Sequence, residues 1–124
     1  MCLNNWGGID HKVLEFHEYV NLFSGKSGSG KSTVMDAIQV ILYGSFSPSF
    51  LNKAADDAKN RRSVLSYLRG EQKDGSANRK DCDFCSVIAL EIEDTGTHII
   101  TCIGIAFEVR KSDSEIKKFV YFSH

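Results

Sequence analysis

One short stretch constrains this chain more than any other. Gly25-Lys-Ser-Gly-Ser-Gly-Lys31-Ser32 fits the pattern G-x-x-x-x-G-K-[ST] at every fixed position. Its glycines leave backbone N–H groups open to a phosphate, because side chains at those positions would block the approach. The stretch lies between an apolar segment and an amphipathic one, which is the strand–loop–helix context that the pattern requires. We therefore predict a phosphate-binding loop (P-loop) in an α/β fold.

The groups that would bind a nucleotide are local in sequence. A helix beginning near Lys31 supplies unpaired N–H donors and a positive dipole end, and Lys31 adds a flexible charge for the β- and γ-phosphates of ATP. We expect the Ser32 hydroxyl to bind Mg²⁺ and the Thr33 hydroxyl to contact the α-phosphate. The predicted nucleotide-binding residues are Gly25, Lys26, Ser27, Gly28, Ser29, Gly30, Lys31, Ser32 and Thr33.

Residues 1–44 are predicted to contain strands, the P-loop and the phosphate helix. The strand predictions are Met1 to Trp6, Val13 to Phe16 and Tyr19 to Phe23, which are short, β-rich and bounded by turn residues. We expect the last of them to lie in a central sheet. After the P-loop an apolar face recurs at helical spacing and ends at a C-capping Gly44. Its residues are Val34, Ala37, Ile38, Ile41 and Leu42.

Residues 45–84 form a basic segment of predicted helix and loop. The helix is expected over Lys53 to Arg69 with Gly70 ending it, and residues 70–81 are a polar, mobile loop. Basic side chains outnumber acidic ones here, in a chain whose net charge is −1. This excess is either a surface for DNA phosphates or an ordinary solvated surface. The residues selected for DNA contact are Arg61, Arg62, Arg79 and Lys80.

From residue 85 to 122 the apolar period changes to two, which predicts an antiparallel β-subdomain. Two alternating runs flank a tight turn at Asp94 to Thr97, as in a β-hairpin, and Ile116 to Phe122 is expected to be a third strand. Together with the two preceding parts, this makes residues 1–124 a single P-loop lobe.

Composition excludes several classes of protein. A chain of 124 residues has the size of one domain, and 42% hydrophobic residues with a single proline argue against wholesale disorder. The near-neutral charge argues against a polybasic nucleic-acid binder. No apolar run approaches the roughly 20 residues of a membrane span, and no apolar leader is visible, so we expect a cytoplasmic protein without a membrane partner.

Trp6 has two possible roles. It ends the first predicted strand, and its indole could stack on the adenine of a nucleotide held by the P-loop. Alternatively, it packs in the core, as large aromatic side chains usually do.

Beyond the motif itself, the chain resembles the N-terminal head lobe of SMC-type ABC ATPases. The resemblance rests on Ser24 to Thr33, then Met35-Asp-Ala-Ile-Gln39 and Leu42-Tyr-Gly44, and on the opening Leu3 to Ile9. Two further segments make it most similar to the MukB/MksB branch and to the Wadjet JetC-type subunit: Phe50 to Ala55 and Arg62 to Gly70. One departure is Gly7, which stands where the family has a basic residue after the strand aromatic.

The resemblance implies that the whole protein is an ATPase that organises or repairs DNA or defends against plasmids. It also implies that the 124 residues are a fragment of that ATPase. In such heads the signature motif and the carboxylates for Mg²⁺ and water come from a C-terminal lobe and a second head. Hydrolysis is then expected only in that assembly, which binds DNA and can include a kleisin-type subunit. Two alternatives remain open: a small P-loop kinase and a domain that senses nucleotide without turnover.

Overall fold

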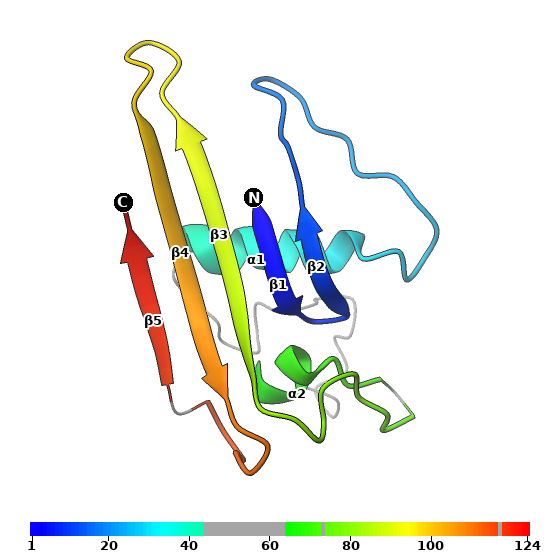
Figure 1. Cartoon of the computed structure of the whole chain (residues 1–124). Helices are drawn as coiled ribbons and strands as arrows, with labels where there is room; N and C mark the ends of the chain where they lie inside the picture. Colours follow the sequence, from blue (N-terminus) through cyan, green and yellow to red (C-terminus); the bar gives the residue numbers. More distant parts are fainter. Residues whose placement is uncertain (44–63, 73, 117) are drawn as a thin grey trace.

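The structure is a computed structural model that describes residues 1–43, 64–72, 74–116 and 118–124. In this part of the chain a five-stranded antiparallel sheet has the order β2-β1-β3-β4-β5 (Figure 1). The elements, in chain order, are β1 (Cys2–Trp6), β2 (Ile9–Val13), α1 (Lys31–Tyr43), α2 (Val64–Arg69), β3 (Phe84–Glu93), β4 (Ile100–Val109) and β5 (Lys118–Ser123).

The predicted hairpin is confirmed as β3 and β4, which pair along their whole lengths from Phe84↔Val109 to Glu93↔Ile100. Its turn is stabilised by the Asp94 carboxylate, which accepts hydrogen bonds from the amides of Gly96 (2.8 Å) and Thr97 (2.9 Å). The N-terminal strand β1 pairs with β3, so that the two ends of the chain contribute to one sheet.

One face of the sheet is covered by the helices, and this is where the core lies. In Figure 1, α1 runs behind the sheet, across the direction of the strands. Period-two alternation directs Ile105, Phe107 and Val109 of β4 to this face, while helical spacing directs the core side chains of α1 toward them. In β1 the core residues Leu3 and Trp6 are three positions apart, and the positive φ of Asn5 (49°) interrupts the alternation between them. The core residues are Leu3, Trp6, Val34, Ala37, Val40, Ile41, Val64, Leu65, Tyr67, Leu68, Ile88, Ile105, Phe107 and Val109.

Two strand predictions in the N-terminal part are wrong. The second strand is Ile9–Val13 rather than Val13 to Phe16. Tyr19 to Phe23 is not a strand: it belongs to a segment that arcs away from the sheet in Figure 1. Tyr19 and Leu22 are 88% and 89% exposed. A strand needs a neighbouring strand for its N–H and C=O groups, and this segment pairs with no strand of the described sheet, in which β2 forms the edge.

Gly70 ends α2, as predicted. Its φ is +69°, its amide donates to the Tyr67 carbonyl (3.0 Å), and the Glu71 amide donates to the Ser66 carbonyl (3.1 Å). These two bonds form a Schellman motif, which favours glycine because of the left-handed backbone. Gly44 and the predicted helical residues before Val64 lie outside the described residues. In the part that the structure describes, neither helix is a candidate membrane span.

Candidate nucleotide-binding site

The P-loop leads directly into α1. Its backbone has positive φ at Gly28 (82°) and Gly30 (95°), a conformation that side chains disfavour. The Ser29 amide donates to the Lys26 carbonyl (3.1 Å), and the Val34 amide donates to the Gly30 carbonyl (3.0 Å) as the first bond of the helix. Glycine is therefore required at these two positions by the shape of the loop.

The N-terminus of α1 is suited to an anion. The first-turn amides of Lys31, Ser32 and Thr33 have no carbonyl acceptor within the helix. The same turn contains no acidic side chain that would offset the positive end of the helix dipole. This arrangement of donors favours a phosphate group.

The Lys31 ammonium lies over the loop that precedes it. It donates to the carbonyls of Gly25 (2.5 Å) and Lys26 (2.9 Å) and to the Ser29 hydroxyl (3.2 Å). The two carbonyls hold the charge at the mouth of the loop. A phosphate oxygen can replace the longer contact with Ser29, because a hydroxyl is a weaker partner for an ammonium than an anion is.

A cavity of about 1060 Å³ opens beside the P-loop. One wall is Ser27 to Thr33, so most of the predicted nucleotide-binding residues line it. Gly25 and Lys26 do not line it but support Lys31 through their carbonyls. The rest of the lining, called here the second wall, comes from distant parts of the chain. It consists of Gly7, Gly8, Ile9, Tyr67, Gly70, Glu71, Gln72 and Asp74.

The second wall was not predicted from the sequence, which indicated only a polar, mobile loop over residues 70–81. The structure shows a tight turn here. The Gln72 amide donates to the Ser76 carbonyl (2.7 Å), the Gly75 amide donates to the Gln72 carbonyl (3.1 Å), and Glu71 bridges to Ala77. The Asp74-Gly75 pair was the available signal, since this dipeptide is typical of turns.

Asp74 contributes an ionised carboxylate to the second wall. Hydrogen bonds from the Ser76 hydroxyl (2.6 Å) and the Ser76 amide (2.9 Å) hold the pKa of Asp74 below its ordinary value. A carboxylate repels phosphate but accepts hydrogen bonds from hydroxyl and amino groups. The P-loop wall therefore suits an anion such as phosphate, and the Asp74 carboxylate makes the second wall better suited to hydroxyl or amino groups.

The structure corrects the adenine-stacking role suggested for Trp6. Its side chain is fully buried, and its ring packs against Tyr67 at a centroid distance of 5.0 Å. The indole N–H donates to the Thr33 carbonyl (2.9 Å). An indole with no exposed surface cannot stack on a base, so Trp6 packs in the core and ties β1 to the first turn of α1.

The structure also corrects one predicted DNA contact. Arg79 is only 5% exposed, and its guanidinium donates to main-chain carbonyls, which leaves it unsuited to DNA phosphates. Lys80 is exposed. Arg61 and Arg62 lie outside the described residues.

The predicted magnesium ligand, Ser32, is exposed and lines the cavity. Its position on the P-loop wall fits Mg²⁺, a hard cation that prefers oxygen ligands and usually shares them with substrate phosphates. Among the described residues, no group of three or more His, Cys, Asp or Glu side chains could hold a metal ion. In this part of the chain, Ser32 is therefore a candidate Mg²⁺ ligand that no cluster of carboxylates accompanies.

Comparison with known proteins gives two kinds of match. A family model described as "P-loop containing region of AAA domain" matches residues 1–58. The SbcC component of the nuclease SbcCD from Staphylococcus haemolyticus is 33% identical over 72 residues, covering 55% of this chain and 6% of that protein. The DNA double-strand break repair Rad50 ATPase of Saccharolobus solfataricus is 29% identical over 72 residues, covering 58% of this chain and 8% of that protein.

The chain thus matches only a small part of the length of either relative. Its N-terminal part matches a P-loop region, as the glycine motif predicted, and it is similar to proteins named for a nuclease and for DNA break repair.

Proposed function

We propose that this chain is an ATP-binding lobe of an SMC-like ABC ATPase that acts on DNA. The observation that carries the proposal is the cavity that is lined by the P-loop, the N-terminus of α1 and the second wall. The similarity to the SbcCD component and the Rad50 ATPase supports this class over other P-loop proteins.

In this proposal the P-loop wall binds the triphosphate. The first-turn amides of α1 and the Lys31 ammonium contact the β- and γ-phosphates, and the Ser32 hydroxyl binds Mg²⁺. The metal ion would neutralise charge on the phosphates. The cavity is large enough for a nucleotide, since small-molecule pockets measure roughly 300–1,000 Å³.

Hydrolysis requires groups that we assign to a C-terminal lobe and a second head. A water must be oriented in line with the γ-phosphate, and carboxylates must hold the metal ion. The exposed apolar segment after β2 supports such a partner. More than three-quarters of the residue surface is exposed at Tyr19 (88%), Val20 (78%) and Leu22 (89%). Their backbone belongs to no strand of the described sheet and is suited to pairing with a strand of the partner lobe.

ATP binding and turnover test the proposal together. The 124-residue chain should bind Mg-ATP in calorimetric titration, and Lys31→Ala should abolish binding, because it removes the charge at the mouth of the loop. Lys12→Ala, which changes an exposed lysine of β2, is the matched control and should bind normally. Absence of binding to the unmodified chain would overturn the proposal.

Turnover separates the ATPase lobe from the small-kinase alternative. Steady-state phosphate release should not exceed the release measured with Lys31→Ala. Release above that level, or phosphate transfer to a nucleotide acceptor, would contradict the half-site interpretation and favour a kinase.

The proposed DNA contacts are Lys80, which is exposed, and Arg61 and Arg62, which lie outside the described residues. Replacing all three with Glu should weaken binding to a fluorescent duplex and make its salt dependence shallower, because fewer counterions are released. Unchanged affinity across a salt titration would refute this surface. Lys12→Glu and Lys111→Glu are charge-reversed controls on exposed lysines elsewhere.

The resemblance to the MukB/MksB branch and the Wadjet JetC-type subunit extends the proposal to a kleisin-type partner and to DNA organisation, repair or anti-plasmid defence. Co-expression with a kleisin-type subunit, followed by size-exclusion chromatography, tests that extension. Separate elution of the two proteins would refute it.

A further inference from the structure

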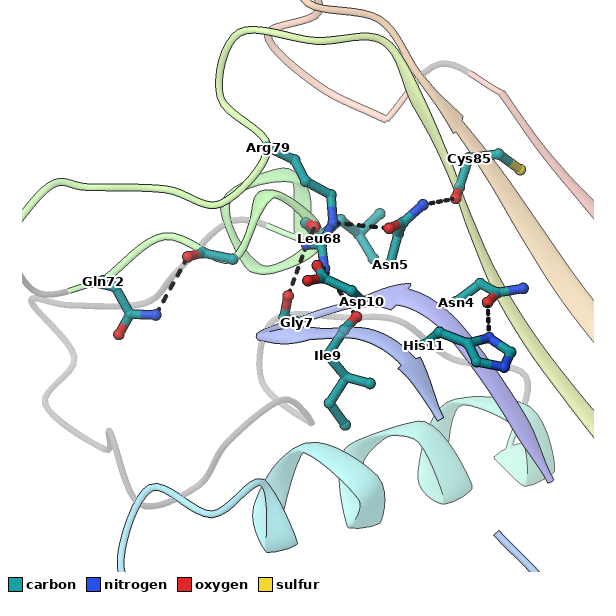
Figure 2. Close-up of polar contacts among 11 residues, drawn as sticks. Asn4, Asn5, Gly7, Ile9, Asp10, His11, Leu68, Gln72, Arg79 and Cys85 are labelled. Atoms are coloured by element: carbon teal, nitrogen blue, oxygen red, sulfur yellow. Dashed lines mark hydrogen bonds and ion pairs between the residues drawn. The ribbon is translucent and has the colours of Figure 1, made fainter. Parts of the chain in front are cut away.

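Arg79 makes more polar contacts than a surface arginine would. Its Nη1 donates to the carbonyls of Gly7 (2.8 Å) and Leu68 (2.8 Å), and its Nη2 donates to the carbonyl of Ile9 (2.9 Å). Its Nε donates to the Asn5 side-chain oxygen (3.2 Å). Figure 2 shows this side chain reaching from its loop toward the turn between β1 and β2.

The surroundings of Arg79 are unusual for a charged group. Burial lowers the pKa of Arg79 from its ordinary value, while the neighbouring Asp10 carboxylate at 3.2 Å opposes that change. The guanidinium also lies 5.6 Å from the ring centroid of Phe84. A planar fork with five donors can satisfy several carbonyls at once, which an ammonium cannot do. Desolvating this charge is costly, so the contacts that it makes offset a substantial penalty.

The segments that Arg79 joins are the two halves of the second wall. Gly7 and Ile9 form the half contributed by the β1–β2 turn. Leu68 lies in the last turn of α2, and the chain continues from there into the other half, which contains Gly70, Glu71, Gln72 and Asp74. The Arg79 amide donates to the Arg69 carbonyl (3.0 Å) and so closes the loop between these two residues. The contact between the halves is close, since a Cβ added at Gly70 would lie 2.9 Å from the Gly7 carbonyl oxygen.

None of these contacts involves the P-loop. Arg79 therefore acts on the second wall only, whose Asp74 carboxylate suits hydroxyl or amino groups rather than phosphate. The phosphate side is held by its own local bonds, such as those of Lys31 to the Gly25 and Lys26 carbonyls.

We propose that Arg79 is a positioning residue that holds the second wall in place for the nucleoside part of the nucleotide. This inference rests on the proposed function, because it assumes that the cavity binds ATP. It predicts that loss of Arg79 weakens binding of ATP and spares binding of inorganic tripolyphosphate, which has no nucleoside.

The experiment measures the dissociation constants of Mg-ATP and Mg-tripolyphosphate for the 124-residue chain and its variants. Arg79→Gln should weaken ATP binding about tenfold, because part of the binding free energy is then spent on ordering the second wall. Tripolyphosphate binding should stay within about twofold of the unmodified chain, and Arg79→Lys should have an intermediate effect on ATP.

Arg69→Gln is the matched control. The Arg69 guanidinium also donates to carbonyls, those of Arg110, Lys111 and Asp113, but these lie in the connection between β4 and β5. Its loss should leave the ratio of the two dissociation constants unchanged. A general loss of packing would instead affect both arginine variants and both ligands alike.

Hydrogen–deuterium exchange on the unmodified chain gives a second measurement that needs no variant to fold. ATP should slow exchange in residues 7–9 and 70–72 as well as in the P-loop, whereas tripolyphosphate should slow it in the P-loop alone. Identical protection by the two ligands, or an unchanged ratio of dissociation constants in Arg79→Gln, would overturn the inference while leaving ATP binding intact. Absence of binding by either ligand would overturn the proposed function and the inference with it.

Discussion

Trp6→Phe distinguishes a core role from base stacking. The substitution removes the pyrrole part of a fully buried side chain and the hydrogen bond to the Thr33 carbonyl at 2.9 Å. A cavity of roughly 40 Å³ costs about 1 kcal/mol. The lost hydrogen bond costs about 1 kcal/mol more. We therefore expect the free energy of unfolding to fall by about 2 kcal/mol.

Urea unfolding followed by far-ultraviolet circular dichroism is the appropriate assay. Trp6 is the single tryptophan of the chain, so the variant has no tryptophan fluorescence to compare. Tyr43→Phe is the control, because Tyr43 is 77% exposed and its loss of a hydroxyl should change stability by less than about 0.5 kcal/mol.

ATP affinity gives the result that would refute this reasoning. A side chain without exposed surface cannot stack on a base, so any loss of ATP affinity in Trp6→Phe should accompany the loss of stability, through its contacts with Tyr67 and Thr33. Unchanged stability combined with a large loss of ATP affinity would show that the indole contacts the base instead.

Two further predictions concern the turns and one ion pair. Gly70→Ala and Gly75→Ala each place alanine at positive φ (69° and 84°), which costs about 1–2 kcal/mol. The added Cβ meets a backbone atom only at position 70, where it would lie 2.9 Å from the Gly7 carbonyl oxygen. Gly70→Ala should therefore lower the urea midpoint further, and equal midpoints would contradict this. The Lys118 ammonium, 2.7 Å away, holds the pKa of Glu108 below its ordinary value of 4.5. A carboxylate whose pKa is lowered in the folded state stabilises the fold at pH values above its ordinary pKa, and this contribution is lost as pH falls through the folded-state pKa. Glu108→Gln should therefore lower Tm at neutral pH and match the Tm of the unmodified chain at about pH 2. A Tm difference that persists in acid would argue against the ion pair.

Much of the fold could be predicted because its signals are local. The β3–β4 hairpin follows from alternation on both sides of the Asp94 turn, and α1 follows from apolar residues at helical spacing. The failure at Tyr19 to Phe23 has a different origin. These residues have the composition of a strand, but strand formation depends on pairing with a neighbour. In the described sheet they pair with neither β2 nor any other strand, although the outer edge of β2 is open.

Arg79 shows a second limit of sequence reasoning. Its position in a basic, polar stretch indicated an exposed side chain, since arginine is rarely buried. Only the approach of the β1–β2 turn to the end of α2 surrounds it with carbonyls. Those acceptors are distant in the sequence, so no pattern in residues 70–81 could have revealed them.

The sequence by itself determined the phosphate side of the candidate site. Glycines that permit the loop, the start of α1 and Lys31 are all consecutive, so their geometry depends on local backbone preferences and hydrogen bonds. Only the tertiary structure decided the second wall and the burial of Trp6 and Arg79. Those features arise when β1 pairs with β3 and the helices cover the sheet, because burial and long-range hydrogen bonds are properties of packed segments rather than of any one of them.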